Sequence, residues 1–218
     1  MKYQGVIFDL DGVICHTDMY HYQAWKQVAD KMGIYFDEAI NNRLRGVSRM
    51  ESLSIILERY EGEPLSDEAK EQLASEKNEA YKALLMQMDE SHVSDAVVST
   101  LLAMRKAGIK LAIGSSSKNA DLILRRIGLS GFFDAVSDGN NIDFSKPHPQ
   151  VFHIAAERIS LLPSECLVIE DAQAGIEAAV AGGFDSAAIG DAKLDARATY
   201  RIDCLEELLP IVLKDIPK

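Results

Sequence analysis

The most chemically informative residues of this 218-residue chain are Asp9 and Asp11, which follow a short apolar run at residues 6–8. An Asp-x-Asp pair by itself most often caps a turn. In an open α/β sheet, however, ligands bind beyond the carboxyl ends of the strands. The pair therefore gains meaning only if other strands of the chain also end in polar side chains.

Other apolar runs do end in this way. Ser115 follows one run, Glu170 and Asp171 follow another, and Lys146 lies in a loop between them. Carboxylates packed together repel one another, and a hard cation bound by oxygen ligands relieves that repulsion. We therefore expect a Mg²⁺ site at one edge of the sheet, facing a phosphate whose charge the metal and Lys146 offset.

The elements that must position these residues alternate along the chain. Short apolar runs with little polar alternation, typical of strands buried on both faces, occur at residues 6–8, 110–114, 135–137, 167–169 and 186–189. Apolar residues at helical spacing predict helices around residues 97–104, 122–127, 151–159 and 174–180, with Pro149 in a first turn. Strands alternating with helices predict an α/β fold with a doubly wound parallel sheet.

Residues 16–92 differ from the rest because they contain no convincing strand. Their apolar spacing predicts helices around residues 25–29 and 53–60, and a third helix that Ser66 caps and that runs to near Met88. We therefore expect a discontinuous core domain with an inserted α-helical cap domain. The expected bounds are residues 1–15 and 93–218 for the core and 16–92 for the cap.

Composition argues against several classes of function. The net charge of −11 is unsuited to non-specific nucleic-acid binding, which needs Lys and Arg to replace counterions. No apolar run approaches the roughly 18 residues of a membrane span, and the chain opens on a strand-like run rather than a signal peptide. Its three widely spaced cysteines fit reduced thiols. We expect a cytoplasmic monomer that binds neither nucleic acid nor membrane.

Taken together, these features resemble the haloacid dehalogenase (HAD) superfamily. Four motifs carry the resemblance, namely the run Asp9-Leu10-Asp11-Gly12-Val13, Ser115, Lys146 and the pair Glu170-Asp171. The insertion after the first motif is similar to the helical cap of that superfamily. The resemblance covers essentially the whole chain and implies a HAD-like, Rossmannoid core.

Within the superfamily, the chain more closely resembles the β-phosphoglucomutase family. The further matches are Thr17, His21, Trp25, the run 46–49, Ser52, the run 115–119, the run 145–147 and the run 170–176. The family usually has Lys where this chain has Arg45, a difference that keeps the charge but changes shape and hydrogen bonding.

The resemblance implies a role for each motif residue. Asp9 is the nucleophile that carries the phosphoryl group as an aspartyl phosphate, and Asp11 is the general acid and base. Ser115 and Lys146 hold the transferring phosphoryl group. The implied metal ligands are Asp9, the backbone carbonyl of Asp11, Asp171 and Glu170.

A mutase also needs a second phosphate site and must keep water from the phosphoaspartate. Arg49 suits that site, together with Ser117 and Asn119, because a guanidinium can grip phosphate bidentately. A solvated helix charge is the alternative for Arg49. By resemblance, Thr17 and His21 hold Asp11 in place when the cap closes, although His21 could also be a structural histidine. The other residues implied to contact substrate are Trp25, Arg45, Gly46, Val47, Ser48, Ser52, Lys77 and Lys118.

Two of these contacts have a competing interpretation. Trp25 could belong to the core of the cap, and a surface role is the stronger expectation for Lys77.

We expect a phosphomutase that interconverts β-D-glucose 1-phosphate and glucose 6-phosphate, with Mg²⁺ as cofactor and glucose 1,6-bisphosphate as phosphorylating activator. A sugar-phosphate phosphatase shares the chemistry and stays an alternative. A binding protein on an inactive scaffold is a third, which the presence of both Asp9 and Asp11 disfavours.

Overall fold

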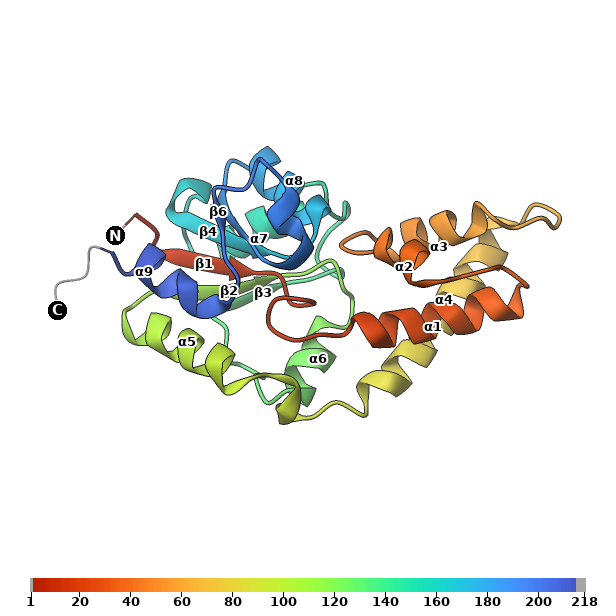
Figure 1. Cartoon of the computed structure of the whole chain (residues 1–218), viewed down its shortest axis with the longest axis horizontal. Coiled ribbons are helices and arrows are strands. Elements are labelled where there is room, and N and C mark those ends of the chain that lie inside the picture. The colour runs from red at the N-terminus through yellow and green to blue at the C-terminus, as the bar shows by residue number, and fades with distance from the viewer. Residues whose placement is uncertain (1, 215–218) are drawn as a thin grey trace.

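The computed structural model describes residues 2–214, and over this range the chain forms a six-stranded parallel sheet with helices on both faces (Figure 1). The strand order is β3-β2-β1-β4-β5-β6. The strands are β1 Gly5–Phe8, β2 Lys110–Gly114, β3 Ala135–Ser137, β4 Cys166–Glu170, β5 Asp185–Ala188 and β6 Tyr200–Arg201. The doubly wound α/β core predicted from the sequence is thus confirmed.

The central strand β1 fixes which residues meet at the edge of the sheet. Phe8, its last residue, pairs with Ile113 of β2 on one side and with Ile169 of β4 on the other. Because parallel strands end at the same edge, the residues that follow β1, β2 and β4 emerge side by side. This register brings the polar side chains of three separate chain segments together.

Alternate residues of β1 pack on opposite faces of the sheet, as strand geometry requires. Val6 and Phe8 belong to an apolar cluster with α5, α6 and α9, whereas Ile7 belongs to one with α7 and α8. The core helices are α5 Asp95–Lys106, α6 Ala120–Arg126, α7 Gln150–Arg158, α8 Gln173–Ala181 and α9 Leu208–Val212. Short 3₁₀ turns complete the core at Pro163–Glu165, Gly190–Leu194 and Leu205–Glu207.

The inserted segment forms a helical layer beside the core, where the chain leaves β1 (Figure 1). Its helices are α1 Asp18–Lys31, α2 Glu38–Asn42, α3 Arg49–Leu57 and α4 Asp67–Leu85, followed by a 3₁₀ turn at Glu90–His92. They enclose an apolar cluster of their own, which includes Trp25, Leu53 and Leu73. The inserted segment is therefore held together by its own burial of apolar area, as a separate module should be.

Several local expectations can be compared with these elements. Ser66 caps α4 as predicted, accepting a hydrogen bond from the Ala69 amide at 3.2 Å. The helix ends at Leu85, however, rather than near Met88, and Pro149 precedes α7 instead of lying in its first turn. The short elements α2, α9 and β6 were not predicted. Within the described range, none of the helices combines the length and the apolar character that crossing a bilayer requires.

Candidate active site

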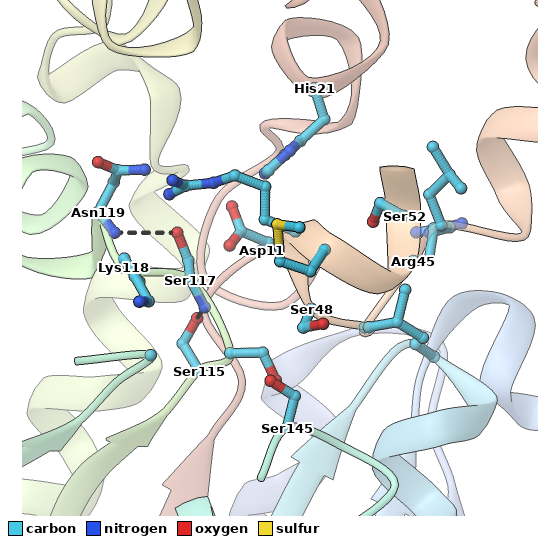
Figure 2. Close-up of a pocket in the computed structure, with 18 of the residues that line it drawn as sticks. Asp11, His21, Arg45, Ser48, Ser52, Ser115, Ser117, Lys118, Asn119 and Ser145 are labelled. Atoms are coloured by element: carbon cyan, nitrogen blue, oxygen red, sulfur yellow. Dashed lines mark hydrogen bonds between the residues drawn. The ribbon is translucent and has the colours of Figure 1, made fainter. Parts of the chain in front are cut away.

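A cavity of about 460 Å³ lies between the carboxyl edge of the sheet and the cap (Figure 2). Every residue that the sequence analysis assigned to catalysis, metal binding or substrate binding lines this cavity, apart from Thr17 and Lys146. Both of these side chains are buried just beneath its surface. The fold therefore collects residues at the ends of β1, β2 and β4 and residues of all four cap helices around one space.

Lys146 connects two of the carboxylates below the cavity. Its ammonium donates hydrogen bonds to Asp9 Oδ1 and, at 2.5 Å, to Glu170 Oε1. Burial opposes a charge on this lysine, but Asp9 and Glu170 outweigh it and raise the lysine pKa above its ordinary value. Lys146 is therefore a fixed cation, held where negative charge gathers.

Burial also raises the pKa of Asp9, whereas the positive charge of Lys146 lowers it. The neighbouring carboxylates Glu170 and Asp171 raise this pKa further. Because the carboxylates work against one another, a bound cation would lower the pKa of Asp9 and favour its ionised, nucleophilic form.

Glu170 is fixed by its surroundings as well as by Lys146. Its second carboxylate oxygen accepts the backbone N–H groups of Asp171 and Ala172, each at 3.0 Å. On the other side lies Gly175 in the first turn of α8, where an added Cβ would collide with the Glu170 carboxylate. The glycine is required there by close approach of the helix to the carboxylate.

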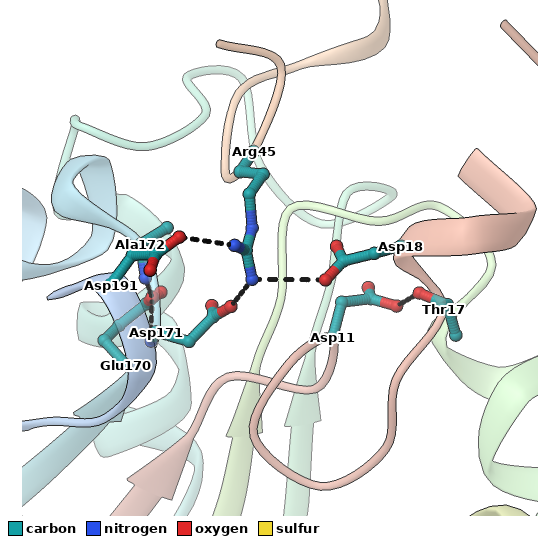
Figure 3. Close-up of polar contacts among 8 residues, drawn as sticks. All are labelled: Asp11, Thr17, Asp18, Arg45, Glu170, Asp171, Ala172 and Asp191. Carbon is teal, nitrogen blue, oxygen red and sulfur yellow. Dashed lines mark hydrogen bonds and ion pairs between the residues drawn. The ribbon is translucent and has the colours of Figure 1, made fainter. Parts of the chain in front are cut away.

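Arg45 of the cap pairs with three carboxylates at the rim of the cavity (Figure 3). Its guanidinium donates to Asp171 at 2.5 Å, to Asp18 at 3.2 Å and to Asp191 at 3.0 Å. Burial and Glu170 raise the pKa of Asp171 to about 7, while Arg45 acts in the opposite direction. The arginine predicted to contact substrate thus engages a predicted metal ligand in this structure.

The oxygen donors near Asp9 fit a hard divalent cation. The Asp171 carboxylate lies so close to Gly12 that a Cβ on that glycine would collide with it, which places this carboxylate against the backbone that follows Asp11. Two carboxylates and a carbonyl, with water at the other positions, are ligands that Mg²⁺ accepts. Between residues 2 and 214 no three acidic, His or Cys side chains converge as a preformed cage. A cation would therefore depend on backbone oxygen and water as well.

Asp11 is held by Thr17. The threonine hydroxyl donates a hydrogen bond to Asp11 Oδ1, as shown in Figure 3. Burial raises the pKa of Asp11 to about 6, and the bond from Thr17 moderates that rise because it stabilises the ionised form. A carboxyl group with this pKa can take up and release a proton near neutral pH, as general acid-base catalysis requires.

His21 contacts Lys77 rather than Asp11. Its Nδ1 lies 2.8 Å from the Lys77 ammonium, and its ring stacks on Tyr81 with centroids 4.1 Å apart. Lys77 is only 3% exposed, and its ammonium also lies over the Trp25 ring. The expectation of a surface role for Lys77 was therefore wrong. Trp25 is buried in the cap core and still reaches the cavity wall.

The loop after β2 is ordered by its own serines. Ser115 Oγ accepts the Ser117 amide at 3.1 Å, and Ser117 Oγ accepts the Asn119 amide at 3.2 Å (Figure 2). Across the cavity, Ser48 caps α3 by accepting the Glu51 amide at 3.2 Å. This serine, predicted to contact substrate, thus also fixes the start of the helix that carries Arg49.

Gly46, two residues before Ser48, lets the cap approach the core. Gly46 has a φ of +76°, and a Cβ there would lie 3.3 Å from the Ala172 side chain. A non-glycine residue would be strained in this conformation, and its side chain would crowd Ala172. Val47 and Ser52 also line the cavity, so this loop and the start of α3 form one continuous part of its wall.

Arg49 differs from Arg45 in having no carboxylate partner among the residues that the structure describes. Its Nη2 donates to Asn78 Oδ1 at 2.8 Å, and it forms no ion pair with any residue in the described range 2–214. Burial lowers its pKa from the ordinary arginine value, but an arginine stays charged. A half-buried cation that faces a cavity without a counter-ion is suited to bind an anion.

Three residues that contact the arginines of the cavity were not found from the sequence. They are Asn78, which bonds to Arg49, and Asp18 and Asp191, which bond to Arg45. Asn78 lies among charged helix residues, where neither apolar spacing nor a motif marks it. Asp18 could have been identified as an acidic first-turn residue of α1, but its pairing with Arg45 is a tertiary contact. None of the three could be assigned to the site without coordinates.

Comparison with known proteins shows the family to which the chain is related. Residues 3–183 match the family model of haloacid dehalogenase-like hydrolases. The chain is 38% identical over 188 residues to β-phosphoglucomutase of Bacillus subtilis, covering 86% of this chain and 83% of that protein. It is also 34% identical over 185 residues to the Escherichia coli fructose-1-phosphate phosphatase YqaB, covering 85% of this chain and 95% of that protein.

A solved structure is similar over nearly its full length. The crystal structure of β-phosphoglucomutase from Clostridium difficile superposes with a TM-score of 0.90 at 35% identity, covering 98% of this chain and 96% of that one. The family match, the parallel core and the capped cavity agree with one another. On these grounds the chain belongs to the haloacid dehalogenase-like hydrolases.

Proposed function

We propose that this protein is a phosphomutase that interconverts β-D-glucose 1-phosphate and glucose 6-phosphate. The observation that carries the proposal is Arg49, which lies on the cap wall of the cavity whose core wall holds Asp9 and has no counter-ion among residues 2–214. One anion-binding position beside Asp9 and Lys146 and another beside Arg49 suit a sugar that carries two phosphates. A phosphatase needs only the first position.

The chemistry begins from phosphorylated Asp9, with glucose 1,6-bisphosphate as the activator that supplies the first phosphoryl group. Asp11 removes the proton from the 6-hydroxyl of the sugar, whose oxygen bonds to phosphorus as the bond from phosphorus to Asp9 breaks. The product is β-glucose 1,6-bisphosphate and free Asp9. After the bisphosphate turns around, Asp9 attacks the 1-phosphate, and Asp11 returns its proton to the leaving sugar oxygen.

The charges of this cavity support both steps. Mg²⁺, when bound by Asp9, Asp171 and the backbone carbonyl of Asp11, would offset the repulsion between a carboxylate and a phosphate. Lys146 is a fixed ammonium beside Asp9 and would contact the transferring phosphoryl group together with Ser115. The phosphate that does not react would meanwhile bind near Arg49, with Ser117, Lys118 and Asn119 around it.

Transfer to a sugar hydroxyl rather than to water would depend on the cap. We propose that the cap extends over residues 16–92 and excludes water when it closes on the core of residues 1–15 and 93–218. Thr17, whose hydroxyl is bonded to Asp11, lies at the start of this segment. Movement of the cap would therefore change the position of Asp11, so that the general base acts only in the closed state.

A sugar-phosphate phosphatase is the second candidate. It is favoured by the 34% identity to a protein named as a fructose-1-phosphate phosphatase, which this chain matches over 95% of that protein's length. The two activities would share Asp9, Asp11 and Lys146. They differ in whether a hydroxyl or water reaches the phosphoaspartate.

A direct assay separates the candidates. The protein is supplied with β-glucose 1-phosphate, Mg²⁺ and a trace of glucose 1,6-bisphosphate, and glucose 6-phosphate and free phosphate are measured together. We expect glucose 6-phosphate to dominate and Asp9→Asn to abolish its formation. Release of mainly free phosphate would establish the phosphatase instead, and full turnover by Asp9→Asn would contradict both candidates.

A further inference from the structure

Asn78, on helix α4 of the cap, joins three elements through one atom. Its side-chain oxygen accepts a hydrogen bond from Arg49 Nη2 at 2.8 Å and another from Asn119 Nδ2 at 3.0 Å. Arg49 is the first residue of α3, and Asn119 immediately precedes α6 of the core. The same oxygen therefore orients a guanidinium of the cap and an amide of the core, and it connects the two layers.

Asn78 acts from behind the cavity. Arg49 and Asn119 both line the cavity wall, whereas Asn78 does not. Its oxygen takes one N–H from each of them, and the guanidinium has further donors that stay available to a ligand. Asn78 is thus placed to set the direction of two phosphate-binding groups without touching the phosphate itself.

The charge of the residue at this position matters as much as its shape. Arg49 forms no ion pair among residues 2–214, and Glu79, the acidic residue that most supports its charge, is exposed and paired with Lys82 at 3.0 Å. A carboxylate in place of Asn78 would form a charge-assisted bond to the guanidinium and compete with an incoming phosphate. A neutral acceptor orients Arg49 and leaves its positive charge uncompensated.

We propose that Asn78 is a positioning residue for the phosphate that does not react, and that its neutral amide is what keeps Arg49 competent to bind an anion. The inference rests on the proposed function, because it assumes a second phosphate position beside Arg49. It assigns a part in substrate affinity to a second residue of α4, besides Lys77. Binding of that phosphate should then favour the position of the cap in which Asn78 and Asn119 are hydrogen-bonded to each other.

The test measures binding to the second phosphate position without turnover. Wild-type protein, Asn78→Asp and Asn78→Ala are treated with Mg²⁺ and beryllium fluoride, which occupies Asp9 as an analogue of the aspartyl phosphate, and ¹⁹F NMR verifies that occupancy. Glucose 6-phosphate is then titrated by calorimetry, since its phosphate can bind only at the second position. Gln27→Glu, on the exposed face of α1, adds the same charge to the cap away from the cavity and is the matched control.

The isosteric substitution separates a role in charge from a role in structure. We expect Asn78→Asp to weaken glucose 6-phosphate binding by about tenfold or more, because a charge-assisted bond is roughly twice as strong as a neutral one. Asn78→Ala should weaken it less, and Gln27→Glu should leave it unchanged. If Asn78→Ala does not fold, as judged by circular dichroism, Asn78→Ser takes its place.

Two other outcomes would overturn the inference in different ways. Binding by Asn78→Asp within twofold of wild type, with loss only in Asn78→Ala, would show that Asn78 is merely structural, while the mutase proposal would stand. Failure of the wild-type protein to bind glucose 6-phosphate would remove the second phosphate position and the mutase proposal with it.

Discussion

Lys77 lies in an environment that is unusual for a lysine. It is almost fully buried in the cap, its ammonium lies over the rings of Trp25 and Tyr81, and its polar neighbour is the uncharged ring of His21. Burial and the charge of Arg49 lower its pKa to about 7, and Asp11 acts in the opposite direction. Keeping this lysine charged therefore costs the folded protein free energy.

The sign of this cost can be tested. The unfolded chain protonates Lys77 up to its ordinary pKa of 10.5, and the folded protein only up to about 7. The destabilisation is therefore complete below pH 7 and disappears as the pH rises towards 10.5. We expect Lys77→Met to raise the free energy of unfolding by roughly 2–4 kcal/mol at pH 6.5 and by clearly less at pH 9. Thermal and urea unfolding at both pH values measure it.

Lys82 on the same helix provides the control, because it is more exposed and pairs with Glu79. Lys82→Met should change stability little, and equally at both pH values. A pH-independent gain in Lys77→Met would mean that apolar packing, and not the suppressed charge, is responsible. Activity should fall in Lys77→Met in any case, since Lys77 lines the cavity.

At the scale of elements, the site depends on how closely α8 approaches the end of β4. Gly175 of α8 lies against the Glu170 carboxylate, which in turn fixes the ammonium of Lys146. Helix propensity alone would favour alanine over glycine by roughly 0.5–1 kcal/mol. The steric clash with Glu170 is the larger effect here, because the carboxylate is buried and is held by hydrogen bonds from Lys146 and from two backbone N–H groups.

We therefore expect Gly175→Ala to lower both stability and activity, against the helix-propensity trend. The free energy of unfolding should fall by about 1–3 kcal/mol, the typical cost of overpacking. Product formation should fall at least tenfold, because Lys146 and Glu170 are displaced. Ala181→Gly at the end of the same helix is a control, in which the loss of stability should leave turnover unchanged. A Gly175→Ala variant more stable than wild type would contradict this account.

The elements that the sequence predicted best are those with a local signal. Apolar runs identified the central strands, and Ser66 identified the start of α4, because burial and capping are encoded by neighbouring residues. The two-residue edge strand β6 and the five-residue helix α2 carry too few residues for a periodic pattern.

Within the site, motif residues such as Asp9 and Lys146 were accessible from the sequence, since strand ends converge on one edge. The supporting contacts were not accessible. Asn78 and Asp191 act through partners that are distant in sequence, and the burial of Lys77 depends on how α4 packs against α1. From sequence alone, a charged residue on a helix is predicted to be solvent-exposed, because its burial depends on the position of a neighbouring helix.

At the scale of the whole molecule, Arg45 ties the cap to the core. It bonds to Asp171 and Asp191 from the core and to Asp18 from the start of α1. Asp171 is also a candidate ligand of Mg²⁺, so the guanidinium and the metal would compete for the same carboxylate. Metal binding and the position of the cap should consequently be coupled.

We expect Arg45→Ala to bind Mg²⁺ more tightly by roughly fivefold, equivalent to about 1 kcal/mol. Calorimetric titration of the protein without substrate measures this directly. Arg43→Ala is the matched control and should leave the affinity unchanged, because Arg43 pairs with Glu58 on the cap surface, at 2.8 Å, and with no other acidic residue in the described part of the chain. Equal or weaker affinity in Arg45→Ala would show that the arginine does not compete with the metal.

The position of β1 has a further consequence for how the protein is made. This strand is synthesised first, yet it lies at the centre of the sheet, and its two partners begin only at Lys110 and Cys166. The cap helices make contacts that are local in sequence and have their own apolar cluster. They can therefore form on the ribosome before the two partners of β1 have been synthesised. Asp9, the proposed nucleophile, thus reaches its final surroundings late in translation, after the cap helices have formed.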